Sequence, residues 1–509
     1  MAMRVKLKHL VSALATTAAI ATIATAPALA VDLRIGIGED PDILDPDQSR
    51  TFVGEVVFAN MCDKLVGITP DLEIIPQLAT AWTWSEDGLS LAMDLREGVT
   101  FQDGTPFDAA AVVANIDRSM TLDESRRKSE LTSIADVTAE GGHRVVFTLN
   151  APDATLLARF AARSGAMMSP EAFIAAGLEF GNNPVCVGPY KFKERIAQDR
   201  IVLEKDPTYY NAEAYHFDSI TYLPIPDSTV RLANLRSGDL DMIERIPAVD
   251  AAGVKADANL TYAEAKGIGY SGITVNVANG AGADTPLAQS NLVRQAFSLA
   301  IDRAALNQVV FDGAFTPGNQ PFSPTSPWYD ANFPVPGRDV EKARALLVEA
   351  GFPNVDVQLT VPNSPESMQI AQVIQSMVTE VGFNLTIQAT EFATLLAAQT
   401  AGDYQADLVG WSGYVDPDAN LNQFVTCAGG INDSKYCNPE LDTLLATARA
   451  STDPVLRKQN YDAARVILDR DLPLIYLYHS TWIWGMDKEV TGFVPYPDGL
   501  LRLEGVTKG

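Results

Sequence analysis

The sequence predicts an α/β fold divided into two or more lobes. Segments with the apolar alternation of strands come between segments with the spacing of amphipathic helices, and the loops between them are short. This order is typical of lobes in which helices cover a sheet. The chain has 509 residues, more than one hydrophobic core usually holds, so we expect at least two lobes.

The clearest local pattern lies in the first quarter of the chain. Residues 90–95 alternate between apolar and small or polar side chains, as in a half-buried strand. Asp87-Gly88 and Asp103-Gly104 are dipeptides that favour tight turns. Asp108 precedes an amphipathic run to about Met120 and is the expected N-cap of a helix there.

Other elements follow from the same signals. Strands are expected at 33–38, at 144–149, at 201–205, after Gly188-Pro189-Tyr190, and through Leu385, Ile387 and Ala389. Helices are expected over 291–311, from Asp339 to Gly351, and from Ser364-Pro365 to Gly382, the last with proline at its first position.

The first thirty residues have the pattern of a secretory signal peptide. Arg4, Lys6 and Lys8 precede an apolar run over 10–23, and Ala28-Leu29-Ala30 is a small-x-small cleavage site. The alternative is a membrane anchor, for which the run is short and rich in alanine and threonine. We expect cleavage after Ala30, export to the periplasm of a Gram-negative bacterium, and no lipid anchor.

Charge and composition exclude several classes of partner. The net charge is −26, and loss of the three cations in the first thirty residues would make it −29. Such a chain is not expected to bind nucleic acid or an anionic membrane surface. After residue 30 no stretch of about 18 apolar residues occurs, so we expect no membrane insertion of the mature chain.

Metal and cofactor sites are not predicted. No C-x-x-C pair occurs among the four cysteines, Cys62, Cys186, Cys427 and Cys437. In an exported chain such cysteines are expected to form disulfides. Gly267-Ile-Gly-Tyr-Ser-Gly272 matches the dinucleotide-binding pattern, but an alternating strand follows it where a helix is required. We therefore expect no cofactor.

Catalytic motifs are also not found. The sequence has no G-x-S-x-G, H-E-x-x-H or Walker motif, and nothing selects a catalytic pair among its 64 acidic residues. We predict that the protein is not an enzyme, with no catalytic residues. Trp482 and Trp484 are expected in the core.

The motifs of the first quarter, taken in order, resemble the signature of the family 5 extracellular solute-binding proteins, which serve peptide and nickel ABC importers. They are Gln77-Leu-Ala-Thr-Ala-Trp82, Asp87-Gly88, Leu95-Arg-Glu-Gly98 and Phe101-Gln-Asp-Gly-Thr-Pro-Phe107. Later matches are Gly188-Pro-Tyr-Lys-Phe, Gly238-Asp-Leu-Asp241, Arg294-Gln-Ala, Ala300-Ile-Asp-Arg303 and Asp416-Pro-Asp. The resemblance covers essentially the whole chain after residue 30.

The resemblance implies a two-lobe periplasmic binding protein with a ligand cleft between the lobes. It implies a discontinuous first lobe (31–50, 178–278 and 478–509), a small inserted subdomain (51–177) and a second lobe (279–477). It also implies a Cys427–Cys437 disulfide, because many relatives carry this pair before Asn438-Pro439-Glu440. The pairing of Cys62 with Cys186 stays open.

The implied function is the substrate-binding component of an ABC transporter. Such a protein closes around a peptide-like or other small amphipathic solute and delivers it to an inner-membrane permease, as a monomer; nickel chelates and opine-like conjugates also occur as ligands. Two alternatives remain: an exported hydrolase of peptides or glycans, and a periplasmic chaperone or sensor.

The expected ligand site centres on the loop after the apolar strand at 406–410, because ligand groups commonly lie on loops at strand ends. In the relatives the segment around Tyr270 also passes near the cleft. The expected ligand-binding residues are Tyr270, Trp411, Ser412, Gly413, Tyr414, Asp416 and Asp418.

Two charged anchors of dipeptide-binding relatives are missing. Tyr414 stands where those relatives have an aspartate for the peptide amino group, and the helix from Ser364 begins Pro365-Glu366-Ser367 where they have an arginine for the carboxylate. This argues against a free dipeptide as the ligand. Asp416 or Asp418 could take over the amino group, or could simply cap the loop.

Overall fold

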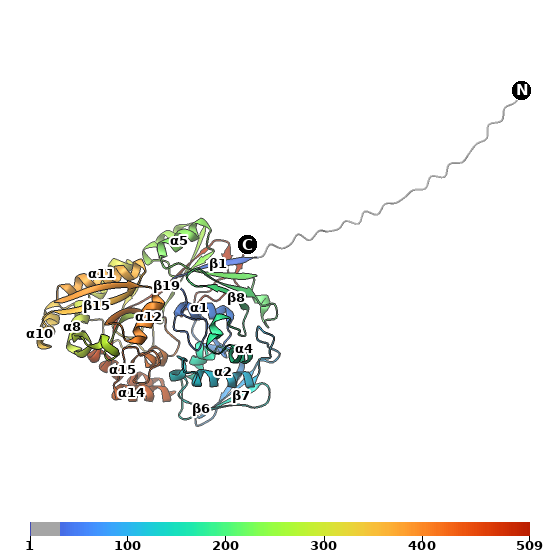
Figure 1. Cartoon of the computed structure of the whole chain (residues 1–509), viewed down its shortest axis with the longest axis horizontal. Coiled ribbons are helices and arrows are strands. Elements are labelled where there is room, and N and C mark those ends of the chain that lie inside the picture. The colour runs from blue at the N-terminus through green and yellow to red at the C-terminus, as the bar shows by residue number, and fades with distance from the viewer. Residues whose placement is uncertain (2–30) are drawn as a thin grey trace. The chain divides into compact units, whose positions relative to one another are not determined.

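Three larger sheets and the helices that cover them make up residues Val31–Gly509 (Figure 1). The computed structural model describes Met1 and residues 31–509, so the expected signal peptide lies outside the described residues. None of the described helices is both long and apolar enough to cross a membrane. The predicted α/β class is confirmed.

A seven-stranded mixed sheet forms the centre of what we call the first lobe. β1 runs parallel to its neighbours β10 and β11, and the other pairs are antiparallel. In spatial order the strands are β12 (Leu260–Lys266), β19 (Thr481–Asp487), β11 (Met242–Ile243), β1 (Asp32–Ile37), β10 (Ser219–Pro224), β9 (Arg200–Lys205) and β8 (Tyr190–Ile196).

A six-stranded mixed sheet forms the centre of the second lobe. β15 runs parallel to β16 and β17, whereas β13 is antiparallel to both of its neighbours. Every residue of β18 is buried, which explains its nearly continuous apolar sequence. In spatial order the strands are β14 (Thr316–Pro317), β18 (Leu474–His479), β13 (Tyr270–Val275), β17 (Ala406–Trp411), β15 (Val355–Pro362) and β16 (Phe383–Thr390).

A four-stranded antiparallel sheet lies within the segment expected as an inserted subdomain. Its order is β4 (Ala79–Trp84), β5 (Ser90–Leu95), β7 (Arg144–Leu149) and β6 (Ile134–Ala139). The remaining strands form two small pairs, β2 (Val66–Ile68) with β3 (Ile74–Pro76) and β20 (Val490–Thr491) with β21 (Thr507–Lys508).

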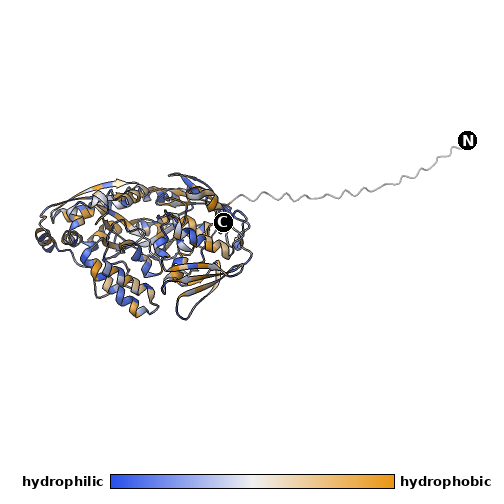
Figure 2. Ribbon diagram, turned by 60° about the horizontal axis from the view of Figure 1, so that its bottom comes forward, coloured by the Kyte–Doolittle hydropathy of each residue, from blue (hydrophilic) through white to orange (hydrophobic). Residues whose placement is uncertain are grey.

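The helices cover these sheets, and polar and apolar residues alternate along them (Figure 2). The α-helices are α1 (Phe52–Met61), α2 (Ala109–Thr121), α3 (Leu156–Phe160), α4 (Pro170–Ala176), α5 (Ser228–Ser237), α6 (Ala251–Ala256), α7 (Pro286–Gln289), α8 (Asn291–Ala300), α9 (Arg303–Phe311), α10 (Val340–Glu349), α11 (Pro365–Thr379), α12 (Phe392–Ala401), α13 (Asn422–Val425), α14 (Pro439–Ala450) and α15 (Pro454–Asp471). Short 3₁₀ turns occur at Lys128–Glu130, Arg163–Gly165, Gly177–Asn182, Ala212–Ala214, Ala248–Asp250, Gly280–Ala283 and Pro417–Asn420 (η7).

The predicted helix starts are confirmed. Asp108 accepts a hydrogen bond from the backbone N–H of Ala111 at the start of α2, and Asp339 accepts one from Lys342 at the start of α10. These bonds satisfy backbone donors that have no partner inside the helix. α11 begins at Pro365 as predicted but ends at Thr379, three residues before Gly382.

The prediction of one helix over 291–311 is wrong. α8 ends at Ala300 and α9 begins at Arg303. Between them Asp302 has an extended backbone, and its carboxylate accepts a hydrogen bond from the N–H of Ala305. Asp302 is thus an N-cap inside a run with continuous helical spacing, and it starts a second helix.

The chain passes directly between the two large sheets at two adjacent places. β12 leads through residues 267–269 into β13, and β18 leads through Ser480 into β19. The N–H of Gly267 donates to the carbonyl of Ser480 at 3.0 Å, which holds the two crossings together. Since β13 belongs to the six-stranded sheet, we propose lobe boundaries at these crossings in place of those expected at 278 and 478.

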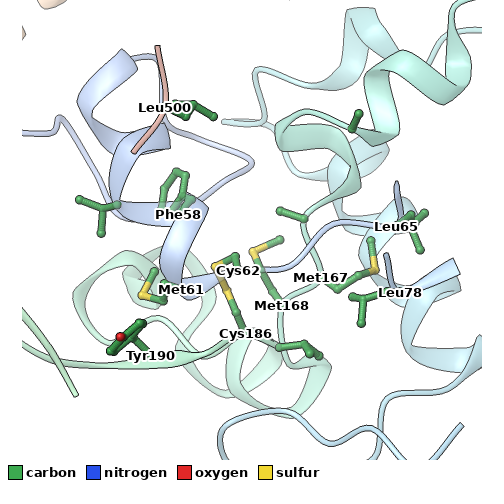
Figure 3. Packing of buried hydrophobic residues seen from close by; sticks show 14 of the residues in the cluster. Phe58, Met61, Cys62, Leu65, Leu78, Met167, Met168, Cys186, Tyr190 and Leu500 are labelled. Carbon is green, nitrogen blue, oxygen red and sulfur yellow. A yellow bond between two sulfur atoms is a disulfide. The ribbon is translucent and has the colours of Figure 1, made fainter. Parts of the chain in front are cut away.

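Two disulfides are present. Cys62–Cys186 joins the end of α1 to the segment before β8, among the buried side chains of Met61, Met168 and Tyr190 (Figure 3). The structure thus pairs Cys62 with Cys186, which the sequence had left open.

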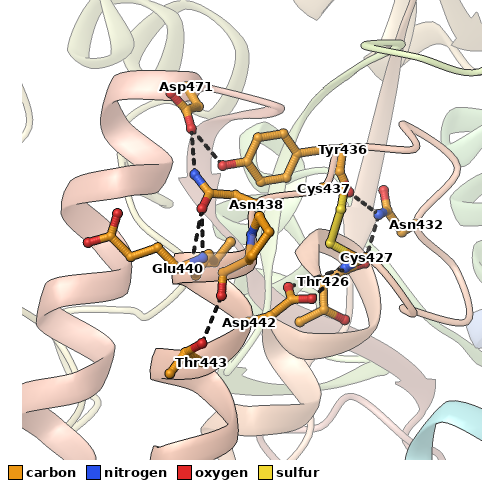
Figure 4. The surroundings of a disulfide bond; sticks show 12 residues. Thr426, Cys427, Asn432, Tyr436, Cys437, Asn438, Glu440, Asp442, Thr443 and Asp471 are labelled. Carbon is orange, nitrogen blue, oxygen red and sulfur yellow. Dashed lines mark hydrogen bonds between the residues drawn. A yellow bond between two sulfur atoms is a disulfide. The ribbon is translucent and has the colours of Figure 1, made fainter.

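The second disulfide, Cys427–Cys437, confirms the pairing that the resemblance implied (Figure 4). It closes a loop in which the Asn432 side chain donates to the carbonyls of Thr426 and Tyr436, at 2.8 and 2.6 Å. The loop is therefore held from both sides, by the covalent bridge and by Asn432.

Candidate functional site: a cavity between the lobes

A cavity of about 230 Å³ lies where the two large sheets meet. Its walls come from both lobes. Glu39, Phe52, Arg245 and Trp482 belong to the first lobe, and Tyr270, Glu366, Phe392, Trp411 and Tyr478 belong to the second. Such a space can enclose a small solute and touch it from both sides.

Aromatic rings form much of this wall. Trp411 of β17 and Tyr270 of β13 are direct partners in the antiparallel ladder, so both reach the same part of the cavity. Opposite them, Trp482 of β19 stacks on Phe52 of α1, with ring centroids 4.7 Å apart and planes 17° apart. Aromatic faces offer a ligand large apolar contact areas.

The structure corrects the expectation that Trp482 is a core residue. Trp482 is half-buried and lines the cavity, and its indole N–H donates to the carbonyl of Pro497 at 3.1 Å. Trp484, two positions later, faces the same side of β19 but is completely buried and packs against Phe493. Alternation alone could not separate the two, because the surroundings of β19 change along its length, from the cavity near the crossing at Ser480 to the buried core.

Asn420, which the sequence did not single out, holds the loop after β17. Its side-chain oxygen accepts hydrogen bonds from the Trp411 indole N–H and from the backbone N–H of Tyr414, both at 2.8 Å. Its side-chain nitrogen donates to the carbonyl of Tyr414 at 3.0 Å. Asn420 therefore orients the Trp411 ring at the cavity wall.

Of the seven expected ligand-binding residues, Tyr270, Trp411 and Ser412 line the cavity. Gly413 lies behind the wall, with a φ of 90°, and a Cβ there would come within 2.6 Å of the Gly269 backbone nitrogen. Its role is to let the loop approach the neighbouring crossing. Tyr414 does not line the cavity, and its hydroxyl lies 3.1 Å from the guanidinium of the wall residue Arg163 and 3.3 Å from the Glu55 carboxylate.

The two expected aspartates are also outside the cavity wall. Asp416 accepts a hydrogen bond from Arg457 at 2.6 Å and from the backbone N–H of Asp418 at 2.9 Å, which caps η7. Asp418 pairs with Arg159 at 2.5 Å and with Arg449 at 2.9 Å. Burial alone would raise the pKa of Asp418, but the two guanidinium groups bring that pKa below its ordinary value. Both carboxylates are therefore already paired within the protein.

The cavity wall carries three cations, and each has an anionic partner within the protein. Arg245 pairs with Glu39 at 3.0 Å, Arg50 with Asp433 at 2.5 Å, and Arg163 with Glu55 at 3.4 Å. The sequence missed these residues because their partners lie far away in the chain, where no spacing pattern connects them.

Glu366 differs from the other charged wall residues. Among the described residues its carboxylate has neither a hydrogen-bond nor an ion-pair partner within bonding distance. Burial raises its pKa, an effect that Arg245 and Arg231 oppose. The sequence drew attention to this position only as one without an arginine.

The G-x-G-x-x-G segment is part of the crossing from β12 to β13, so its glycines do not open a helix. Within residues 31–509 no group of three or more metal-ligating side chains comes together. What the cavity offers is apolar contact, a few polar groups and one unpaired carboxylate, which suits the binding of a small amphipathic molecule.

Comparisons with known proteins agree with this geometry. A model for the family described as "Bacterial extracellular solute-binding proteins, family 5 Middle" matches residues 73–432. The glutathione-binding protein GsiB of Pectobacterium atrosepticum is 30% identical over 516 residues, covering 99% of this chain and 98% of that protein. The glutathione-binding protein GsiB of Escherichia coli O157:H7 is 30% identical over 494 residues, covering 94% and 95%.

Two solved structures are similar over nearly the whole chain. The dipeptide-binding protein of Pseudoalteromonas sp. SM9913, in complex with Met-Leu, has a TM-score of 0.87 and 25% identity, covering 94% of this chain and 100% of that one. The PBP AgaA of A. tumefaciens R10, in complex with agropinic acid, has a TM-score of 0.84 and 25% identity, covering 94% and 99%.

Proposed function

Because this chain belongs to the family 5 bacterial extracellular solute-binding proteins, we propose that it captures a small peptide-like solute in the cavity between its lobes for an ABC importer. The family is one of binding proteins and not of enzymes, so the alternative of an exported hydrolase is not retained. The chain binds its solute without changing it.

The observation that carries the proposal is that both lobes contribute to one cavity wall. A ligand that contacts both lobes stabilises the closed arrangement over any open one, since only the closed arrangement provides both sets of contacts. The volume of about 230 Å³ corresponds to roughly 15 to 20 water-sized groups, about the number of non-hydrogen atoms in a tripeptide. Relatives named for glutathione binding support a solute of this size.

Contacts join the two lobes in this structure. Arg50 reaches Asp433, Arg159 reaches Asp418, and the N–H of Gly430 donates to Ser129 at 3.1 Å. The paired crossings at residues 267–269 and 480 are the natural hinge for opening, because the chain connects the two sheets there with hardly any intervening residues. We propose that opening at this hinge admits and releases the solute.

We also propose that the protein captures and releases its solute in the periplasm. Removal of the first thirty residues would release the protein into the periplasm, where a monomer in the closed form docks on the inner-membrane permease. The similarity to periplasmic binding proteins supports this placement. A periplasmic sensor would use the same fold and is distinguished by its membrane partner.

Native mass spectrometry of the protein purified without unfolding tests the proposal first, since a bound solute adds a mass that is lost on denaturation. Calorimetry with glutathione and a set of di- and tripeptides then measures binding directly. We expect saturable binding of at least one of them, with one site per chain. If none of the peptides binds and none co-purifies, the peptide-like class is wrong.

Two tryptophan variants locate the binding. Trp411→Ala removes a ring from the cavity wall and should weaken binding by about 1–3 kcal/mol, through lost apolar contact. Trp328→Ala removes a half-buried ring that packs on Tyr461 away from the cavity, so it should leave the dissociation constant unchanged. Equal effects of the two variants would place the ligand elsewhere.

A further inference from the structure

Glu366 lies at a junction between two hollows. The cavity continues into a side chamber of about 110 Å³, and Glu39, Arg245, Pro362, Glu366, Ser367 and Phe392 line both. Glu366 is the second residue of α11 and approaches from the second lobe, opposite Arg245 of the first lobe. A ligand that extends from the cavity towards the chamber must pass this carboxylate.

The other charged groups around the junction each have a hydrogen-bond or ion-pair partner within the protein. Arg245 pairs with Glu39, and Asp40 accepts a hydrogen bond from Arg195 at 3.0 Å. Glu391 caps α12 by accepting from the N–H of Thr394 at 2.9 Å. Arg231 donates to the carbonyls of Ile225, Glu244 and Arg245 and is buried.

Among the described charged wall residues of both hollows, Glu366 is the one whose side chain has no hydrogen-bond or ion-pair partner, although one oxygen of Asp40 is also without a hydrogen bond. Glu366 is half-buried, and partial removal of a carboxylate from water without a partner costs free energy. A ligand cation would remove that cost and gain a charge-assisted hydrogen bond. Tyr478 lines the same cavity and adds an aromatic ring to the wall.

We propose that Glu366 binds a cationic group of the solute, a primary ammonium or a guanidinium, and so selects solutes with a free amino or guanidino group. This rests on the proposed function and specifies the solute class further. The ligand amino group would then meet the second lobe at the start of α11, and not the loop after β17, where Asp416 and Asp418 are already paired.

The proposal is tested by calorimetry with matched pairs of probes. Tri-alanine and glutathione are each compared with their N-acetylated forms, and putrescine with its uncharged diacetylated form, on the wild type and on Glu366→Gln. Agmatine is used without an acetylated partner, because acetylation leaves its guanidinium group. We expect the wild type to bind a free-amine probe at least tenfold more tightly than its acetylated partner. In Glu366→Gln this ratio should fall close to one.

Glu341→Gln is the matched control. Glu341 is also an acidic second residue of a helix, α10, but it is exposed and pairs only with Arg344 at 3.0 Å. Both variants lose the same favourable negative charge at a helix N-terminus. Any change in overall stability that comes from this charge should therefore appear in both variants. Only Glu366→Gln should lose the preference for the free amine, and Glu366→Asp should keep part of it.

The outcomes separate the two proposals. If the wild type binds a peptide and its acetylated form equally, or if Glu366→Gln keeps the preference, the role of Glu366 is overturned while the peptide-like function stands. A second outcome is that the wild type binds agmatine or putrescine but no peptide, and that Glu366→Gln loses this binding. The proposal of a peptide-like solute is then overturned, and the proposed role of Glu366 is supported. If no probe binds, both are overturned.

Discussion

Arg50 donates a hydrogen bond to the carboxylate of Asp433 at 2.5 Å, across 383 positions of the chain and from the first lobe to the second. The same guanidinium reaches the carbonyl of Leu396 at 3.2 Å and the hydroxyl of Thr400 at 2.8 Å. Arg50 also lines the cavity. One side chain thus joins the two lobes and also lines the cavity that we propose holds the solute.

Replacing Arg50 by alanine should favour the open form. The lost charge-assisted bonds amount to about 1–3 kcal/mol, and even the lower part of that range weakens solute binding about tenfold. Calorimetry measures the affinity, and small-angle scattering measures the opening. Arg344→Ala, which removes an exposed ion pair with Glu341, is the control; an equal effect in both variants would contradict a role of Arg50 in closure.

Trp482→Ala and Trp484→Ala should separate binding from folding. Trp482 lines the cavity, so its loss should weaken solute binding by about 1–3 kcal/mol through lost apolar contact. Trp484 is fully buried, so its loss should lower the free energy of unfolding by about 3–5 kcal/mol and leave the affinity of the folded protein unchanged. Calorimetry and thermal unfolding measure the two effects, and a reversed pattern would contradict the placement of Trp482.

Asp416→Ala should act on stability alone. Asp416 is buried and paired with Arg457 at 2.6 Å, and both belong to the second lobe. Removing one partner of a buried pair leaves the other uncompensated, at about 3–5 kcal/mol of unfolding free energy. Thermal unfolding should show the loss, whereas the dissociation constant of the folded protein should not change. A loss of affinity without a loss of stability would indicate instead that Asp416 contacts the ligand.

The two disulfides should differ in their contribution to stability. Cys62–Cys186 closes a loop of 124 positions and Cys427–Cys437 one of 10. In the chain-entropy model these loops correspond to about 5 and about 3 kcal/mol. Paired Cys→Ser variants, unfolded by heat under the same conditions, should show the larger drop in Tm for the longer loop. Equal drops would mean that local packing, and not loop length, sets the contributions.

Asp407 should make stability depend on pH. It is completely buried in β17, and burial raises its pKa to about 8. Because the folded state holds this proton more tightly than the unfolded state does, the contribution of Asp407 is full below about pH 4 and declines as pH rises to about 8. Asp407→Asn should match the wild type near pH 4 and exceed it near pH 8 by on the order of 5 kcal/mol. Thermal unfolding across this range measures the difference; parallel curves would show that Asp407 is ionised at neutral pH.

Local signals in the sequence were sufficient for many elements. The N-caps Asp108 and Asp339, and the strand at 144–149, follow from neighbouring residues, because capping and alternation are properties of a few consecutive positions. The motifs between Gln77 and Phe107 were also sufficient to predict the family. Local reasoning failed at Asp302, where a cap interrupts a run with helical spacing.

The candidate site depended on contacts that no local pattern contains. The sequence by itself determined that Trp411 stands at the end of an apolar strand, but only the folded chain decided that Trp411 and Trp482 line one cavity while Asp416 and Asp418 pair with arginines. The partners of Asp418, at positions 159 and 449, and of Arg50, at position 433, come from distant segments. A charged side chain is free to bind a solute only if the fold has not already supplied its partner, and that depends on which segments the tertiary structure brings together.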